Sequence, residues 1–311
     1  MVSQASIIET QNLKRYFKLV KAVDSISVSI KPGELFGLVG PDGAGKTTTL
    51  RLLAGLLDIT DGSAQILGYD IQDQAEQIKP KIGYMAQQFS LYEELSVYEN
   101  LTFFADLFQV ATDLIPTRIS RLHDFAGLTD FKGRRAAHLS GGMQKKLALA
   151  CTLIHEPEVL LLDEPTTGVD PISRREFWDI LTELYSHGTT IVVSTPYMDE
   201  ADRCSRVGLM YSGKMVICDT PQVIKSQIQG ELIQITPDDW RTATELLKDQ
   251  SGIYDIQTYG ESLHILVDSA EKRLPEIAKS LKDNGLTYRG ARTTPAGMEE
   301  AFISLIKEME T

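Results

Sequence analysis

The sequence is poor in the features that mark secreted and membrane-spanning proteins. Its 311 residues include 3 cysteines, Cys151, Cys204 and Cys218, and no C-x-x-C pair, so we expect buried thiols and no disulfide framework. No apolar run approaches the roughly 20 residues that span a bilayer, and no N-terminal signal sequence is visible. The sequence therefore predicts a soluble, cytosolic protein that reaches a membrane only through a partner.

Positive charge is also scarce. Lysine and arginine number 31 against 43 aspartates and glutamates, which gives a formal net charge of −12. A general nucleic-acid binder usually presents a basic face, and adhesion to an anionic membrane also needs one. We therefore expect no nucleic-acid partner.

The pattern of apolar residues divides the chain into two domains at about residue 220. Residues 1–220 predict an α/β sheet that is interrupted by a mostly helical insertion at about 92–156. Residues 221–311 predict the order β-α-β-β-α-β with a last helix, which indicates a small ferredoxin-like α+β domain. His264 lies in a strand of this domain and is interpreted as a packing or surface residue. We interpret the domain as a dimer brace or regulatory attachment.

The strongest local signal is the pattern G-x-x-x-x-G-K-T at residues 40–47. An apolar run at 35–39 predicts a buried strand before it, and residues 48–55 predict a helix after it. In this context the glycines let backbone N–H groups point at an anion, the helix N-terminus adds positive potential, and the lysine and threonine serve outer phosphates and Mg²⁺. The residues expected to bind nucleotide phosphates are Gly40, Asp42, Gly43, Ala44, Gly45, Lys46, Thr47 and Thr48.

Two carboxylates end a second apolar run. Residues 158–165 read E-V-L-L-L-D-E-P, which predicts a buried strand with an acidic tip. Carboxylates at such a position are costly unless something positive lies opposite, and a magnesium nucleotide would supply that charge. Asp163 is then placed to hold the metal, and Glu164 to orient an attacking water or accept its proton.

Two weaker signals have ordinary structural explanations. Strands are expected at 7–10 and 26–30, with a loop between them. An aromatic residue in this loop, Tyr16 or Phe17, could stack on a purine, although packing is the commoner role of such a residue. The run L-S-G-G-M-Q at 139–144 opens a helix whose N-terminus offers N–H groups to an anion. A serine cap with a glycine pair explains the same residues. The helices of the insertion are expected at 98–108, 114–125 and 142–154.

Five motifs stand in one order: the phosphate loop, a strand that ends at Gln87, L-S-G-G-M-Q, L-L-L-D-E-P and T-G-V-D-P. Their order and spacing resemble the ATP-binding subunits of ATP-binding-cassette (ABC) transporters over about residues 5–220. The tail at 294–302 resembles the ending of drug- and polysaccharide-exporter subunits. The resemblance implies a phosphate-loop cassette with a mixed sheet and a helical subdomain. It also implies ATP hydrolysis that powers a separate membrane permease from the cytoplasmic face of the membrane.

The family's roles can be carried onto matching residues. The resemblance implies that Tyr16, or Phe17 as second choice, stacks on adenine, and that Gln87 reaches Mg²⁺ and the attacking water. It implies a head-to-tail homodimer, or a pseudo-dimer with a related cassette, that closes on ATP and opens after the γ-phosphate is lost. By this resemblance the catalytic residues are Lys46, Gln87 and Glu164. The residues implied to hold the metal are Thr47, Gln87 and Asp163. Those implied to meet the opposite subunit or its ATP are Ser140, Gly142, Gln144 and Asp170.

Two residues depart from the family's pattern. Pro196 stands where most relatives have a histidine, and a proline cannot donate a hydrogen bond to a phosphate. We expect slowed hydrolysis, or hydrolysis supported by Glu164 alone, and keep an ATP-gated dimer clamp with little turnover as the alternative. Asp42 replaces the usual asparagine, and its negative charge is expected to weaken ATP binding modestly.

Overall fold

The computed structural model describes residues 5–88 and 91–310. The chain divides into two compact units, Met1–Pro221 and Gln222–Thr311. The boundary follows the last strand of the first unit, β10 (Lys214–Asp219), at the start of helix α8 (Pro221–Ser226). None of the helices in the described ranges is both long enough and apolar enough to cross a membrane.

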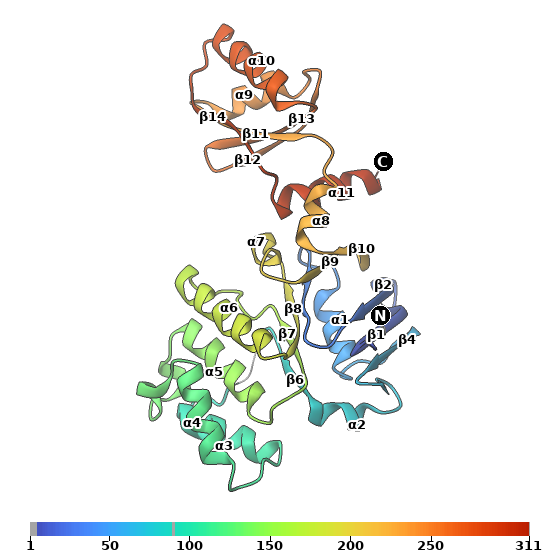
Figure 1. The fold of residues 1–311 in the computed structure, drawn as a ribbon, viewed down its shortest axis with the longest axis vertical. Coiled ribbons are helices and arrows are strands. Elements are labelled where there is room, and N and C mark those ends of the chain that lie inside the picture. The colour runs from blue at the N-terminus through green and yellow to red at the C-terminus, as the bar shows by residue number, and fades with distance from the viewer. Residues whose placement is uncertain (1–4, 89–90, 311) are drawn as a thin grey trace. The chain divides into compact units, whose positions relative to one another are not determined.

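A six-stranded sheet forms the centre of the first unit (Figure 1). Its strands, in spatial order, are β10, β9 (Arg206–Tyr211), β3 (Leu35–Val39), β8 (Thr190–Thr195), β7 (Val159–Asp163) and β6 (Ile82–Met85). The strands from β9 to β6 run parallel, and β10 is antiparallel at the edge. Strands β3, β7 and β8 are buried along their whole length, which is why β3 and β7 are almost continuously apolar and β8 has an apolar centre at 191–193. Their carboxyl ends meet at one edge of the sheet.

An antiparallel sheet completes the α/β part of this unit. Its strands, in spatial order, are β2 (Val20–Ile30), β1 (Ile8–Phe17), β4 (Asp61–Ile66) and β5 (Tyr69–Asp70). Helix α1 (Lys46–Leu53) contacts β7 and β8 of the central sheet and β2 and β4 of this one. One buried apolar cluster joins side chains of both sheets with those of α1, among them Ile8, Leu50 and Val192. The N-terminus of α1 is therefore held from two sides.

The first two strands are longer than the sequence predicts. The expected strand at 7–10 covers the start of β1, which begins one residue later, and the one at 26–30 is the end of β2; the two pair antiparallel up to Phe17 and Val20. The expectation that Tyr16 and Phe17 lie in a loop is therefore wrong, because both belong to β1. Register shifts between Thr10 and Tyr16 break the simple alternation of polar and apolar residues that would have marked this part as strand.

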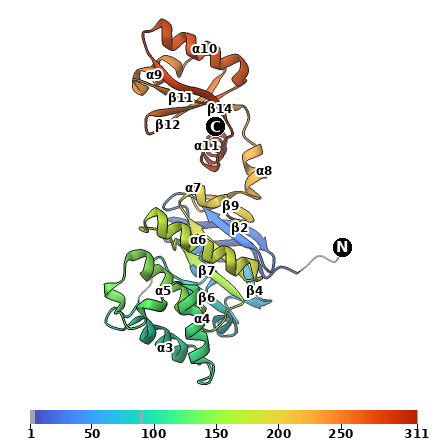
Figure 2. The same ribbon diagram turned by 60° about the vertical axis from the view of Figure 1, so that its left-hand side comes forward.

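The segment between β6 and β7 is helical. Its main helices, α3 (Val97–Leu107), α4 (Ile115–Phe125) and α5 (Gly141–Leu153), begin and end within one residue of the predicted bounds. They contact one another, and α5 also contacts β6 (Figure 2). Ser96 and Glu99 form a reciprocal capping box at the start of α3. The remaining helices of the first unit are α2 (Ala75–Ile78), α6 (Pro171–Ser186) and α7 (Met198–Ala201).

The second unit has the strand order predicted for a ferredoxin-like domain. Its sheet runs β12 (Ile253–Tyr259), β13 (Ser262–Val267), β11 (Glu231–Pro237) and β14 (Tyr288–Thr294), with every neighbouring pair antiparallel. Helices α9 (Trp240–Leu247) and α10 (Ala270–Asp283) share one buried apolar core with it. The order β-α-β-β-α-β with these pairings confirms the predicted fold class. The last helix is α11 (Met298–Glu310).

Candidate nucleotide-binding site

The loop between β3 and α1 is shaped by glycines. Gly43 and Gly45 have φ angles of 78° and 101°, which side chains of L-residues rarely adopt. A Cβ atom at Gly40 would lie 2.2 Å from the carbonyl oxygen of Met210, and one at Gly45 would lie 2.2 Å from that of Ala22. Glycine is thus required where the loop touches β9 and β2. The loop delivers the N-terminus of α1 to an open cleft, as an anion site requires.

Lys46 lies at the centre of this loop. It is 3% exposed, and its Nζ donates to the carbonyl oxygens of Gly40 at 2.8 Å and Pro41 at 3.0 Å. The same Nζ lies 3.2 Å from Glu164 Oε1. A buried ammonium is costly unless it is paired, so Glu164 stabilises the lysine across the floor of the cleft.

Asp163 is fully buried at the carboxyl end of β7. Its Oδ1 accepts hydrogen bonds from Thr47 Oγ1 at 2.9 Å and Ser194 Oγ at 2.8 Å. Its Oδ2 is also buried and has no hydrogen-bond partner among the described residues. A buried oxygen without a partner is costly, and a carboxylate oxygen beside a threonine hydroxyl is the kind of donor set that Mg²⁺ prefers. These residues therefore fit a magnesium ion.

Glu164 is held in a strained and specific position. It is 5% exposed and has a φ of 45°, which is costly for a non-glycine residue and is typical of functional sites. Its backbone N–H donates to Ser194 Oγ at 3.0 Å. Its Oε2 accepts from Gln87 Nε2 at 2.9 Å and Thr167 Oγ1 at 3.3 Å. Gln87, Thr167 and Lys46 thus fix the carboxylate, and Ser194 at the end of β8 fixes the backbone of the same residue.

Lys46 and Glu164 line a cleft of about 1000 Å³, and Asp163 lies behind Thr47, which also lines it. Pro196 and Tyr197 also line it, so the proline noted in the sequence lies at the site. Gly40 and Ala44, which belong to the same loop, are buried. The predicted residues that line the cleft directly are Asp42, Gly43, Gly45, Lys46, Thr47, Thr48, Gln87 and Glu164.

The two aromatic candidates for base stacking differ in position. Phe17 lines the cleft and is 41% exposed, and the Arg15 guanidinium lies 4.6 Å from its ring centroid. Tyr16, the first choice from the sequence, is not among the residues that line this cleft in the described part of the chain. Its hydroxyl donates to Asp24 Oδ1 at 2.7 Å, and that hydrogen bond raises the pKa of Tyr16.

Four predicted residues lie apart from the cleft. Among the residues that the structure describes, Ser140, Gly142, Gln144 and Asp170 do not line it. Ser140 caps α5, since its Oγ accepts from the backbone N–H of the third residue of the helix at 3.3 Å. Asp170 caps α6 by accepting from two backbone N–H groups, and these bonds lower its pKa. Gln144 Nε2 donates to the carbonyl oxygen of Ala136 at 3.0 Å.

Gly142 links the two capped helices. It is buried, and a Cβ atom at its position would lie 2.4 Å from the Cβ atom of Ser173. Any larger residue would push α5 away from the start of α6. The structure thus explains this glycine by packing within one chain, while Ser140 and Gly141 remain exposed at the N-terminus of α5.

Sequence reasoning missed a buried carboxylate beside the site. Glu200 is 2% exposed, and its two oxygens accept from Thr166 Oγ1 at 2.8 Å and Thr195 Oγ1 at 2.5 Å. The threonines follow the carboxyl ends of neighbouring strands, and the bonds anchor the segment that carries Pro196. A signal was available, because Ser194 and Thr195 are polar residues that directly follow the apolar run at 191–193.

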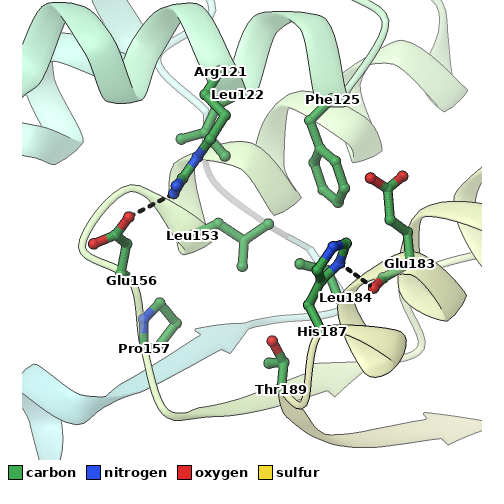
Figure 3. Close-up of a pocket in the computed structure, with 10 residues that line it drawn as sticks. All are labelled: Arg121, Leu122, Phe125, Leu153, Glu156, Pro157, Glu183, Leu184, His187 and Thr189. Carbon is green, nitrogen blue, oxygen red and sulfur yellow. Dashed lines mark hydrogen bonds and ion pairs between the residues drawn. The ribbon is translucent and has the colours of Figure 1, made fainter.

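A separate cavity of about 490 Å³ lies between α4, α5 and the end of α6 (Figure 3). Arg121 pairs with Glu156 at its rim, and the Nδ1 of His187 donates to the carbonyl oxygen of Glu183 at 2.8 Å. Its Pro157 and Thr189 precede β7 and β8, so it borders the amino ends of these strands. None of the predicted site residues lines it. Ligands of parallel sheets bind at the carboxyl ends, where the larger cleft lies.

A glycine-rich loop at a helix N-terminus, a buried lysine and an acidic strand end, all at the carboxyl edge of a parallel sheet, define a phosphate-loop nucleotide-binding cassette. The family model described as "ABC transporter" matches residues 23–167. The chain belongs to the ABC transporter family, among its ATP-binding proteins, which confirms the resemblance drawn from the motifs.

Relatives and solved structures agree with this membership. The chain is 42% identical over 222 residues to the probable multidrug ABC transporter ATP-binding protein YbhF of Escherichia coli, but this match covers 71% of the chain and only 38% of that protein. It is 32% identical to the Nod factor export ATP-binding protein I of Cupriavidus metallidurans, over 96% of the chain and 97% of that protein. The ATP-binding cassette MJ0796, solved as a dimer bound to ADP and Pi, matches with a TM-score of 0.63 and 26% identity over 68% of this chain and 98% of that one.

Proposed function

We propose that this chain binds and hydrolyses ATP and thereby powers a separate membrane-spanning exporter. The observation that carries the proposal is that Lys46 and Glu164 pair in one cleft, while Asp163 lies behind its Thr47 with a buried Oδ2 that has no partner among the described residues. The names of the relatives, a multidrug ABC transporter ATP-binding protein and a Nod factor export ATP-binding protein, support export as the process.

Different residues of the site serve phosphate binding, metal binding and water activation. The loop N–H groups and Lys46 bind the β- and γ-phosphates. Thr47, Asp163 and Gln87 would hold Mg²⁺, which when bound neutralises phosphate charge and fixes the phosphates' orientation. Glu164 orients the attacking water and accepts its proton, and Gln87 holds that carboxylate in place.

The base is assigned to Phe17, which borders the cleft, in place of Tyr16. An exposed ring in this position offers a flat apolar face to any base, and stacking needs no hydrogen bond from it. The hydroxyl of Tyr16 is already committed to Asp24, which favours a structural role for that residue.

The N-terminus of α5 supports a head-to-tail dimer. Ser140 and Gly141 are exposed there and do not line the chain's own cleft, so the helix end has N–H groups to offer to a phosphate held elsewhere. The ATP of a second copy, or of a related cassette, would supply that anion. ATP then closes the pair, and loss of the γ-phosphate opens it.

Exposed aromatics support a membrane partner. Tyr92 and Phe103 have ring centroids 4.4 Å apart, and both are exposed, as is Leu107 one turn further along α3. A patch of this kind is typical of an interaction site. The occupant we propose is a cytoplasmic segment of the permease, which would place the chain at the cytoplasmic face of the membrane.

The test is ATP turnover by the wild-type chain and by Glu164→Gln, each with and without the permease. We expect Glu164→Gln to lose at least roughly 100-fold in kcat, because general base catalysis contributes that much, while it still binds ATP. Negligible turnover in both, with ATP-dependent pairing retained, would instead favour the clamp that Pro196 suggested. Equal turnover in both would contradict the assignment of Glu164.

A further inference from the structure

A lysine on α5 connects that helix to the catalytic glutamate. Lys145 Nζ donates to the carbonyl oxygen of Gln87 at 2.7 Å. The side chain of the same glutamine donates to Glu164 Oε2 at 2.9 Å, and Glu164 Oε1 lies 3.2 Å from Lys46 Nζ. A continuous series of polar contacts thus runs from α5 through Gln87 to the phosphate loop.

Gln87 needs such a contact because it lies beyond the end of its strand. The pairing of β6 with β7 ends at Met85 and Leu162, so the ladder of the sheet does not position the glutamine. The bond from Lys145 comes from a charged donor, and bonds of this kind are shorter and stronger than neutral ones. The hydrogen bond from Lys145 therefore positions Gln87, the residue that holds Glu164, where the strand ladder no longer does.

The surroundings of Lys145 match this role. Burial lowers the pKa of Lys145, while attraction by Asp163 and Glu164 opposes that change. The neighbouring Lys146 differs, because it pairs with Glu176 on α6 and not with the site. Two consecutive lysines on one helix thus have different partners, and Lys146 serves as a matched control.

We propose that Lys145 is a positioning residue for hydrolysis, which fixes the backbone of Gln87 so that its side-chain amide reaches Glu164. Lys145 is not among the described residues that line the phosphate-loop cleft, so it acts through Gln87. The proposal rests on the proposed ATPase function. It predicts that losing the lysine slows the chemical step and leaves ATP binding unchanged, since a base displaced by even a fraction of an ångström is a poorer catalyst.

The experiment compares the wild type with Lys145→Met, Lys145→Arg and Lys146→Met in the full chain, with kcat and KM for ATP measured for each. We expect Lys145→Met to lower kcat roughly 10-fold, the effect of losing one charged hydrogen bond, with KM within about twofold of wild type. Lys145→Arg keeps a charged donor and is expected to restore at least half of kcat. Lys146→Met is expected to change kcat by less than about twofold.

The outcomes separate this inference from the function on which it rests. A wild-type chain without turnover overturns the proposed function and this inference together. A wild-type chain with turnover, whose Lys145→Met variant matches Lys146→Met or loses activity only through KM, overturns the role of Lys145 alone. An arginine variant as slow as the methionine variant would also overturn it. Thermal unfolding of all four proteins identifies any loss of kcat that comes from unfolding.

Discussion

The two units of the chain both bury charged side chains, but they satisfy them differently. In the first unit, the buried Asp163 has one oxygen bonded twice and the other without a partner among the described residues. In the second unit, Glu300 is 7% exposed. One of its oxygens accepts from His264 Nδ1 at 2.8 Å and the other from the backbone N–H of Gly297 at 2.8 Å. The first, open network keeps one oxygen without a partner and reaches the cleft through Thr47, whereas in the second, closed network both oxygens of Glu300 have partners.

Asp255 repeats the closed pattern. Burial alone would raise its pKa, but hydrogen bonds from Lys307 and Gln257 lower it below the ordinary value. Both this residue and Glu300 thereby fasten α11 to the sheet of the second unit. A buried charge by itself therefore does not indicate a site. A buried oxygen without a partner, beside an open cleft, is the feature that distinguishes a site from a structural ion pair.

The largest effect is expected from the open network. Asp163→Asn keeps the shape of the side chain and an oxygen that accepts from Thr47 and Ser194. It removes the negative charge that, in our proposal, binds Mg²⁺. We expect turnover to fall at least roughly 100-fold and Mg²⁺ to lose its influence on ATP binding. Isothermal titration with ATP, with and without Mg²⁺, measures the second effect.

Asp255→Asn is the matched control from the closed network, and its turnover is expected to stay within about twofold of wild type. If Mg²⁺ still strengthens ATP binding by Asp163→Asn as it does in the wild type, then Asp163 does not hold the metal. The proposed difference between the two networks would then be wrong.

A smaller effect is expected where the two aromatics differ. Phe17→Ala removes the ring that borders the cleft, and base stacking on an aromatic contributes about 1–3 kcal/mol. ATP affinity is therefore expected to fall roughly 10-fold, which corresponds to about 1.4 kcal/mol. Tyr16→Ala removes a ring that does not line the cleft, together with its hydrogen bond to Asp24, and is expected to change affinity by less than about twofold. The reverse order of effects would restore the sequence-based choice of Tyr16.

The smallest effect on activity is expected from the closed network. Glu300→Ala leaves His264 and the Gly297 N–H without their partner, so we expect the second unit to lose about 1–3 kcal/mol of its free energy of unfolding. ATP turnover by the chain without its permease is expected to change by less than about twofold. Urea unfolding reports the loss through Trp240 fluorescence in a Trp178→Phe background, because the chain has 2 tryptophans, one in each unit. A large loss of turnover in folded Glu300→Ala would show that the second network is not purely structural.

Local sequence patterns were enough to predict most of the fold and half of the site. The phosphate loop and the pair Asp163 and Glu164 follow directly on apolar strands, so the strands and their tips could be predicted together. The helices of the insertion were predicted within one residue because apolar periodicity marks them, and serine caps mark the starts of α3 and α5. The predicted ferredoxin-like order was found for the same reason.

The remaining features depend on contacts between distant residues. Whether Tyr16 or Phe17 meets the cleft depends on a register that shifts within β1, and no local pattern reveals such a shift. Glu200 bonds to Thr166 across 34 positions, and His264, interpreted as a packing or surface residue, bonds to Glu300 across 36. Lys145 resembles any solvated helix lysine until the fold brings it to Gln87.

The most direct measurement is the association state of Glu164→Gln with and without Mg-ATP, followed by sedimentation velocity. We expect monomers without nucleotide and dimers with Mg-ATP, because in the proposed dimer the phosphate held by Lys46 completes a contact with Ser140 of a second copy. Adding Ser140→Arg should prevent pairing while each chain still binds ATP, since Ser140 lies outside its own cleft. Chains that stay monomeric at saturating Mg-ATP, or that pair equally well with Ser140→Arg, would contradict the account.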